Sequence, residues 1–265
     1  MSRIAYLCRL LPFVLAATVS LSLPLHSQAA DSLTILITGA NRGIGFEFVK
    51  QYSDKGWKVI ATCRNPDAAD ELNAFAEGHD NVTVERLDLI DHAGIDVLAL
   101  KYQDQPIDVL LNNAGLMRGP DKEQTVGTID YEEFDRFYRI NAMGPLKVAE
   151  AFSPNVIASE QKVMAALTTG KGNRGIPVPG FTLYKTSKAA LDSIQTEMAL
   201  RWKSQGVKVV TLLPGRVYTH GETANPNTRG VVDIEDSIGG MIVVLDGLTM
   251  DQSGHTITWD GDMID

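Results

Sequence analysis

Tyr184 and Lys188 stand four residues apart in the sequence Tyr-Lys-Thr-Ser-Lys. On a helix this spacing places both side chains on one face. An ammonium beside a phenol stabilises the tyrosinate, so it lowers the tyrosine pKa from about 10 and allows general acid catalysis near neutral pH. The same spacing also occurs in amphipathic helices with a surface lysine, so its meaning depends on the features that accompany it.

A glycine-rich segment follows the first β-branched run of the chain, with the spacing G-x-x-x-G-x-G. Glycine lets the backbone turn sharply and approach a ligand closely, and the N-terminus of a following helix attracts an anion. Glycines at such a turn can also serve packing alone, but the first turn of a doubly wound sheet favours a dinucleotide pyrophosphate. The candidate cofactor-binding residues here are Gly39, Asn41, Arg42, Gly43, Ile44 and Gly45.

The second expected strand is followed by Cys63 and Arg64, and no acid occurs before Asp67. An acid at this place would bind a free ribose 2′-hydroxyl, whereas a base pairs with a 2′-phosphate. Arg42, in the glycine-rich turn, is a second candidate cation. These two residues predict NADP(H) in preference to NAD(H), although two solvated arginines would give the same sequence.

The elements that must position these groups alternate along the chain. Short apolar runs favour strands over 33–38, 58–62, 82–87, 107–111, 162–168, 207–213 and 255–259. Helical spacing covers 44–52, a segment through Leu72 and Phe75 that follows the capping-type sequence Asn65-Pro66-Asp67, 131–152, 183–204 and 234–248. This alternation predicts an α/β fold in one domain, with a doubly wound, mostly parallel sheet of about seven strands and helices on both faces.

The sequence Asn112-Asn113-Ala114-Gly115 follows the fourth expected strand. Together with the glycine-rich turn and the Tyr184/Lys188 pair, it resembles the short-chain dehydrogenase/reductase superfamily from Leu33 to the C-terminus. The segments 237–240 and 253–254 are further similar to the C-factor-like and carbonyl-reductase-like branches. The resemblance implies a Rossmann fold that binds NAD(P) and transfers a hydride between nicotinamide and a carbonyl or alcohol.

The resemblance also implies roles for individual residues. Tyr184 would protonate the substrate oxygen, Lys188 would hold the nicotinamide ribose, and Asn141 would organise a water that returns the proton. The other residues implied in cofactor binding are Asp88 and Leu89 at the adenine, Asn113, Ala114 and Gly115 at its ribose, and Pro214, Gly215, Val217 and Thr219 at the carboxamide.

One position departs from the family pattern, because the catalytic serine expected after the fifth strand is replaced by Thr168-Thr169. Thr169 is the better match and Thr168 the second; Thr169 could instead be a plain strand-end residue. A threonine hydroxyl can donate to a carbonyl oxygen, but its methyl group restricts the side chain. The following segment is about two residues longer than expected. The segment 216–233 could close over a substrate or be an ordinary surface connection.

The first thirty residues have the pattern of a signal peptide, with 31–265 as the mature domain. Arg3 and Arg9 precede an uncharged stretch over 10–25, and small residues end it. The stretch is shorter than roughly 18 residues and contains two prolines, which disfavours a stable membrane span. Cleavage would place the protein in the periplasm or outside the cell. An uncleaved anchor remains open, as does a spurious upstream start on a cytoplasmic protein.

Composition narrows the partners of this chain of 265 residues, whose formal net charge is −9. An acidic chain has no general attraction to nucleic acid, and scattered histidines with two cysteines indicate no metal site. The expected partner is therefore a small carbonyl or alcohol, and the resemblance implies a homodimer or homotetramer. A different function also remains open: an exported, catalytically impaired binding or signalling protein, because no soluble NADPH supply is expected in the periplasm.

Overall fold

The structure is a computed structural model, and it describes residues 32–117, 124–170, 180–217 and 231–264. Residues Ser32–Asp265 form one compact unit. The expected signal peptide and Thr219 lie outside the described residues.

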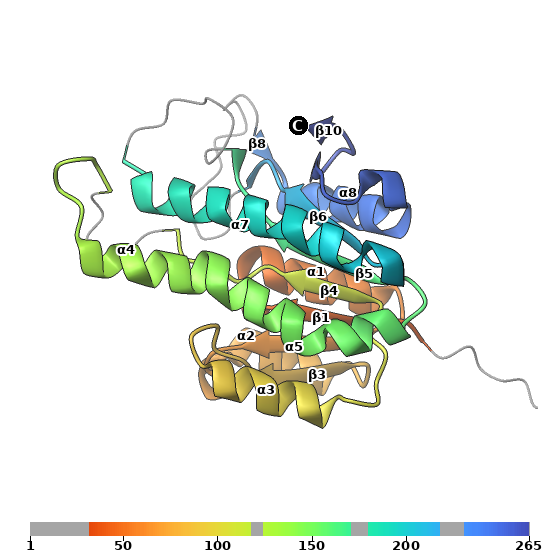
Figure 1. The fold of residues 1–265 in the computed structure, drawn as a ribbon. Helices are drawn as coiled ribbons and strands as arrows, with labels where there is room; N and C mark the ends of the chain where they lie inside the picture. Colours follow the sequence, from red (N-terminus) through yellow and green to blue (C-terminus); the bar gives the residue numbers. More distant parts are fainter. Residues whose placement is uncertain (1–31, 118–123, 171–179, 218–230, 265) are drawn as a thin grey trace, which may run out of the picture. The chain divides into compact units, whose positions relative to one another are not determined.

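A sheet of eight strands crosses the centre of this unit in the order β10-β9-β6-β5-β4-β1-β2-β3 (Figure 1). The strands are β1 Thr34–Thr38, β2 Lys58–Cys63, β3 Val82–Arg86, β4 Val109–Asn112, β5 Val163–Leu167, β6 Lys208–Leu213, β9 Thr256–Thr258 and β10 Met263–Ile264. All neighbours pair in parallel except β10, which runs antiparallel to β9. The predicted mostly parallel α/β sheet is confirmed. It has one more strand than expected, because the two residues of β10 are too few to show a periodicity.

The direction in which strands are added reverses between β1 and β4. β2 and β3 extend the sheet on one side of β1, whereas β4, β5 and β6 extend it on the other. The connections that leave the carboxyl ends of β1 and β4 therefore diverge, and such a switch point is where open α/β sheets bind ligands. The glycine-rich turn and the Asn112–Gly115 segment follow these two strands.

Helices cover both faces of the sheet, as predicted (Figure 1). Side chains that alternate along β1 enter different cores, with Ile35 and Ile37 on one face and Leu36 on the other. One core contains apolar residues of α1 (Gly43–Asp54), α2 (Asp70–Glu77) and α8 (Ile234–Asp246). The other contains those of α3 (His92–Lys101), α5 (Gly144–Ala158) and α7 (Thr182–Trp202). Burial on both faces explains the continuous apolar runs of the strands.

The prediction of one continuous helix over 131–152 is wrong. The chain forms α4 (Tyr131–Tyr138), a π-helical segment (Arg139–Met143) and then α5. Pro145 has no N–H to donate to the carbonyl four residues earlier, so the regular hydrogen-bond ladder cannot continue there. Gly144 lies close against Leu89, whose Cβ would be 2.6 Å from a Cβ at position 144. The π-helical segment contains Asn141, one of the expected site residues.

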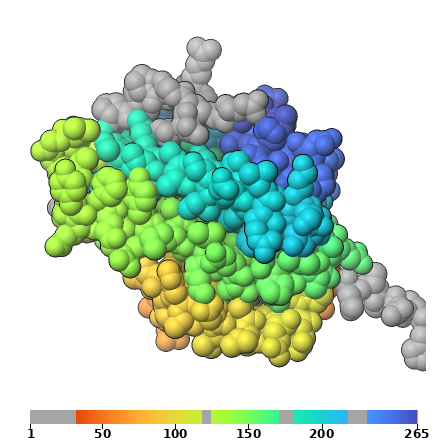
Figure 2. Space-filling view, in the orientation of Figure 1, coloured from red at the N-terminus to blue at the C-terminus, as the bar shows by residue number. Residues whose placement is uncertain are grey.

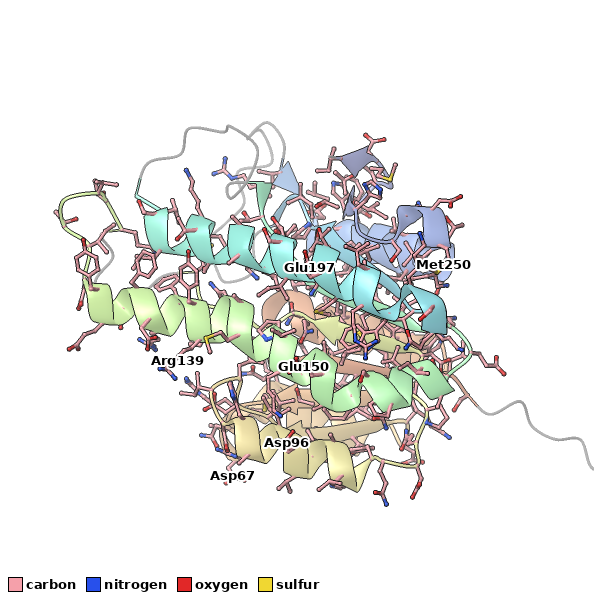
Figure 3. The ribbon with its side chains drawn as sticks, in the orientation of Figure 1. Asp67, Asp96, Arg139, Glu150, Glu197 and Met250 are labelled. Atoms are coloured by element: carbon pink, nitrogen blue, oxygen red, sulfur yellow. The ribbon has the colours of Figure 1, made fainter. Side chains whose placement is uncertain are left out.

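Two further local predictions need correction. Helix α3 was missed; its N-cap is Asp91, whose side chain accepts a hydrogen bond from Gly94 N at 3.0 Å. Asp96, labelled on α3 in Figure 3, forms an ion pair of 2.5 Å with Lys147 of α5. Asn65 does not cap a helix; a 3₁₀ turn follows it, and α2 begins only at Asp70.

Short strands lie at both ends of the segment 216–233, which was expected to be a loop. β7 (Arg216–Val217) pairs in parallel with β8 (Val231–Val232) as a separate two-stranded sheet. Residues 218–230 between them lie outside the described part of the chain.

A buried carboxylate joins the amino ends of three neighbouring strands. Asp108, just before β4, accepts hydrogen bonds from Thr34 N at 2.9 Å and from Glu160 N and Gln161 N at 3.2 Å each. Its side chain thus satisfies backbone donors at the start of β1 and before β5. No local pattern of residues indicates this role, because it depends on three separate segments.

We expect Asp108→Ala to lower the free energy of unfolding by roughly 2–4 kcal/mol, because three backbone donors lose a charged acceptor in a buried place. Chemical denaturation measures the change. Asp104→Ala, at an exposed position of the same connection, is the control and should leave stability unchanged. Equal stability of the two variants would contradict the role assigned to Asp108.

Candidate active site

The glycine-rich turn is held against the end of β4. Asn113 Nδ2 donates to Thr38 O at 2.8 Å and to Gly39 O at 3.0 Å, and Ala114 N donates to Thr38 Oγ1 at 3.1 Å. A Cβ at Gly45 would lie 2.3 Å from Gly39 O and 2.4 Å from Asn113 Nδ2. The backbone therefore approaches itself at a distance that only glycine permits at position 45.

The turn can receive an anion. Helix α1 begins at Gly43, its N-cap residue Arg42 makes no side-chain capping bond, and its first turn holds no acid. The first N–H groups of a helix have no intrahelical partner, and the helix dipole is positive at this end. Gly39 and Gly43 have φ values of 67° and 56°, which favour glycine. With Asn41 and Ile44 between the glycines, this cradle fits a dinucleotide pyrophosphate.

Two exposed arginines stand beside this cradle. Ala40 N donates to Thr62 O at 2.9 Å, which places the turn next to the end of β2, where Arg64 follows. Neither Arg42 nor Arg64 has an ion-pair partner among the residues that the structure describes. Arg86, after β3, differs because it pairs with Asp91 at 3.1 Å. Both guanidinium groups are thus available to a phosphate.

The residues expected at the adenine lie after β3. The side chain of Asp88 accepts a hydrogen bond from Ile90 N at 3.2 Å and is half-buried, whereas Leu89 is buried beside Gly144. Leu89 therefore belongs to the hydrophobic core, where it packs against the start of α5.

The Tyr184/Lys188 pair lies on the first turns of α7, beside the ends of β4 and β5. Lys188 is 3% exposed, and its Nζ donates to Leu167 O at 2.8 Å. A Cβ at Gly115 would lie 3.4 Å from Lys188 Nζ, so the segment after β4 passes directly over the ammonium. The structure thus brings the expected acid, its lysine and the Asn112–Gly115 segment together at the carboxyl edge of the sheet.

Asn141 connects this segment to α7. Its Oδ1 accepts from Leu116 N at 2.7 Å, and its Nδ2 donates to Leu116 O at 2.8 Å and to Ser187 Oγ at 2.9 Å. Both amide hydrogens are therefore used within the protein. A water held by Asn141 must bond to one of its oxygens.

Burial changes the protonation of the pair in opposite directions. It raises the pKa of Tyr184, and the negative charge of Asp192 adds to this rise, while a hydrogen bond with Thr169 opposes it. Burial lowers the pKa of Lys188 to about 8, against the influence of Asp192. The expectation that Lys188 lowers the pKa of Tyr184 is wrong for this structure, because desolvation outweighs other effects and the lysine bonds to Leu167 O.

The two candidate threonines after β5 have different surroundings. The side chain of Thr169 hydrogen-bonds with Tyr184. Thr168 is buried, continues the pairing with β6 through its N–H to Leu212 O at 2.9 Å, and has an Oγ1 without a partner in the described structure. Of the two hydroxyl groups, that of Thr169 lies where it can face a substrate.

The residues expected at the carboxamide follow β6, next to β5. Pro214 O accepts from Ser237 Oγ at 2.7 Å, and Gly215, with a φ of 79°, lies against Trp259. Val217 belongs to β7, and Thr219 lies outside the described residues.

Two polar residues at the site were missed from the sequence. Ser187 binds Asn141, and its place in the Tyr184–Lys188 turn could have drawn attention to it. Gln124 binds the backbone of α7 and had no comparable signal, because it is sixty residues from its partner Tyr184.

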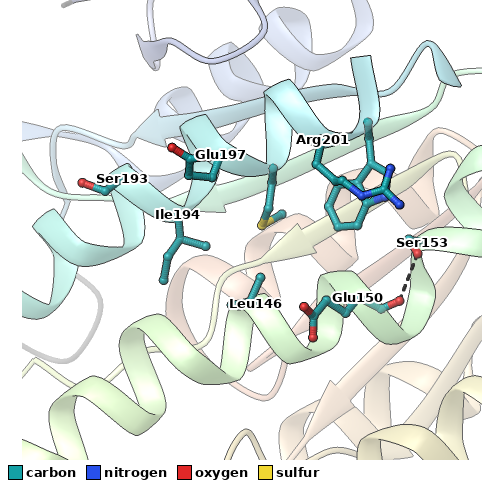
Figure 4. Close-up of a pocket in the computed structure, with 9 residues that line it drawn as sticks. Leu146, Glu150, Ser153, Ser193, Ile194, Glu197 and Arg201 are labelled. Atoms are coloured by element: carbon teal, nitrogen blue, oxygen red, sulfur yellow. Dashed lines mark hydrogen bonds between the residues drawn. The ribbon is translucent and has the colours of Figure 1, made fainter. Parts of the chain in front are cut away.

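A groove of about 720 Å³ lies elsewhere, between α5 and the later turns of α7 (Figure 4). Its charged residues are Glu150, Glu197 and Arg201. In the space-filling view of Figure 2, α5 (green) and α7 (cyan) adjoin on the visible face. The groove contains none of the residues expected to do chemistry.

The described segments hold no candidate for two other kinds of site. They contain no cluster of three or more His, Cys, Asp or Glu side chains able to hold a metal. No helix among them has the length and apolar character needed to cross a membrane.

Comparisons with known proteins identify the family and the fold. The profile of the family described as short chain dehydrogenase matches residues 33–229. A Rhodococcus sp. (strain AD45) relative, 1-hydroxy-2-glutathionyl-2-methyl-3-butene dehydrogenase, is 30% identical over 232 residues, covering 86% of this chain and 97% of the relative. NADPH-bound carbonyl reductase from chicken fatty liver superposes with a TM-score of 0.80 at 27% identity, covering 88% of this chain and 94% of that one. Carbonyl reductase Sniffer of D. melanogaster gives 0.78 at 27% identity, covering 88% and 99%.

The buried lysine predicts a pH dependence of stability. Its pKa is about 8 in the folded protein and has the ordinary value of 10.5 in the unfolded chain, so the unfolded state binds more protons between these values. Lys188 therefore adds a contribution to the free energy of unfolding that rises by roughly 1–3 kcal/mol from pH 8 to pH 10.

Denaturation curves of the wild type and of Lys188→Met over this pH range measure the contribution as the difference between their unfolding free energies. The exposed Lys203, at the end of the same helix, gives the control Lys203→Met, which should retain the wild-type dependence. A difference between wild type and Lys188→Met that stays constant with pH would show that the ammonium is not desolvated.

Proposed function

This chain belongs to the short-chain dehydrogenase family, and from that membership we propose that it is an NADP(H)-dependent oxidoreductase. Its reaction transfers a hydride between the nicotinamide and a small carbonyl or alcohol. The NADPH in the carbonyl reductase from chicken fatty liver supports the cofactor, and the name of that enzyme supports the substrate class.

The observation that carries this proposal is the meeting of an acid with an anion cradle at one sheet edge. Tyr184, hydrogen-bonded to Thr169, stands beside the ends of β4 and β5, while the glycine-rich turn follows neighbouring β1. A dinucleotide that places its pyrophosphate at Gly43–Gly45 lies at the switch point between these strands.

The protein's own groups supply binding, orientation and a proton. When bound, the dinucleotide donates or accepts the hydride. In the reductive direction the Tyr184 hydroxyl donates its proton to the substrate oxygen, and the Thr169 hydroxyl donates a hydrogen bond to the same atom. Lys188 holds the nicotinamide ribose. An oxygen of Asn141 holds the water that returns a proton.

We propose that Arg42 and Arg64 select the phosphorylated cofactor. Arg42 follows β1 and Arg64 follows β2, and these two strands are neighbours in the sheet. Both side chains are exposed and have no ion-pair partner among the described residues. A 2′-phosphate would give them the bidentate acceptor that suits a guanidinium.

The first test of the function is an assay of NADPH oxidation with a panel of aldehydes, ketones and quinones. We expect Tyr184→Phe to lower kcat by roughly 10²–10⁴-fold, because it removes the general acid. NADPH affinity, measured by fluorescence titration, should be retained. Tyr131→Phe, at a residue that is 82% exposed, is the control.

Undiminished turnover in Tyr184→Phe would refute the assignment of the acid. A wild-type protein that binds NADPH but reduces no member of the panel would favour the catalytically impaired alternative.

The second test concerns the cofactor. The double variant Arg42→Ala/Arg64→Ala should lose about 10- to 100-fold in the ratio of kcat/KM for NADPH to that for NADH, because two charge-assisted contacts disappear. The value of kcat/KM for NADPH should fall, whereas that for NADH should stay unchanged. Arg201→Ala, in the groove between α5 and α7, should leave the ratio unchanged. Equal use of both cofactors by the wild type would overturn the selection.

A further inference from the structure

Gln124 is a buried polar residue that no step of the proposed reaction uses. It is 1% exposed, and it precedes α4 in the connection that leaves β4. A buried amide needs partners for both of its ends. Gln124 has them, and they belong to two different segments of the site.

One set of partners is the start of α7. The N-cap residue of this helix, Phe181, makes no side-chain capping bond. Instead, Thr182 N donates to Gln124 O at 3.1 Å, and Tyr184 N donates to Gln124 Oε1 at 3.0 Å. N-cap residues usually supply such acceptors from within the helix's own sequence. Here a residue from another segment satisfies two otherwise unpaired donors, one of them on the proposed acid itself.

The other end of the amide reaches the segment after β4. Gln124 Nε2 donates to Met117 O at 2.8 Å. That segment also contains Gly115, which passes over Lys188, and Leu116, which is bonded in both directions to Asn141. Gln124 thus joins the first turn of α7 to the backbone that lies over the buried ammonium.

We propose that Gln124 is a positioning residue for Tyr184, and this inference rests on the proposed function. Its amide fixes the first turn of α7 relative to the Ala114–Met117 backbone. That in turn fixes the direction from which the Tyr184 hydroxyl meets Thr169 and the substrate oxygen. Proton transfer is sensitive to such geometry, because a displacement of about 1 Å can cost 10²-fold in rate.

Two substitutions separate the hydrogen bonds from the packing. Gln124→Met keeps an unbranched side chain of similar length but removes both side-chain bonds. Gln124→Glu keeps an acceptor for Tyr184 N, and a carboxylate is favourable at a helix N-terminus. We expect Gln124→Met to lower kcat roughly 10- to 100-fold with unchanged NADPH affinity. Gln124→Glu should recover part of the loss.

The solvent isotope effect on kcat separates positioning from a general loss of folded protein. A misplaced acid slows proton transfer, so the isotope effect should rise in Gln124→Met. A smaller folded fraction lowers the rate but leaves the isotope effect unchanged. Gln252→Met is the matched control. Gln252 Oε1 also accepts a hydrogen bond from a backbone N–H at a helix start, Thr249 N at 2.9 Å. This helix start lies beside the amino end of β6, because the next residue, Ser253, accepts from Val209 N.

Hydrogen exchange tests the contact without any substrate. Amides 182–185 should exchange about ten-fold faster in Gln124→Met than in the wild type, and at the wild-type rate in Gln252→Met. If the wild type reduces no substrate, the proposed function fails. The exchange rate of amides 182–185 then tests the contact between Gln124 and α7 by itself. Unchanged exchange at 182–185, or a rate loss without a change in isotope effect, would overturn the inference.

Discussion

The site depends on a charge that the fold removes from water. Lys188 carries an ammonium that is 3% exposed, and its Nζ donates a hydrogen bond to Leu167 O at 2.8 Å. The same burial lowers the pKa of Lys188 to about 8 and raises that of Tyr184. The raised pKa keeps the Tyr184 phenol protonated at neutral pH. The phenol can therefore donate a proton, which suits its proposed role.

Holding that charge requires several segments to keep fixed positions. The ammonium lies between the end of β5, the first turns of α7 and the backbone after β4. Asn141 ties this backbone to α7 through Leu116 and Ser187, and the π-helical segment around Asn141 sets where its amide stands. On the other side, Asn113 fixes the turn after β1 through Thr38 and Gly39. The acid and the anion cradle are thus parts of one hydrogen-bonded edge.

The sequence predicts the elements of this edge better than its energetics. Continuous apolar runs predict the parallel strands, and the spacing of Tyr184 and Lys188 places both on α7, because these are local properties. The direction of the Tyr184 pKa shift depends on burial, which no local pattern reports. The π-helical segment depends on the missing N–H of Pro145 and on the contact of Gly144 with Leu89. The role of Gln124 depends on Tyr184, sixty residues away. The pKa shift of Tyr184, the π-helical segment and the role of Gln124 each depend on contacts between distant segments.

The replacement of serine by threonine can be understood from the same edge. Thr168 still pairs with β6, so consecutive residues there point to opposite sides and only one of the two hydroxyl groups can face α7. Thr169 is that one, because its side chain bonds with Tyr184. A β-branched residue has few χ1 rotamers, so a threonine hydroxyl directed at the phenol remains so directed at a lower entropic cost than a serine. In the proposed reaction, its methyl group would narrow the space beside the substrate oxygen. Threonine would then retain the donor and restrict the shape of the carbonyl compound that the proposed site accepts.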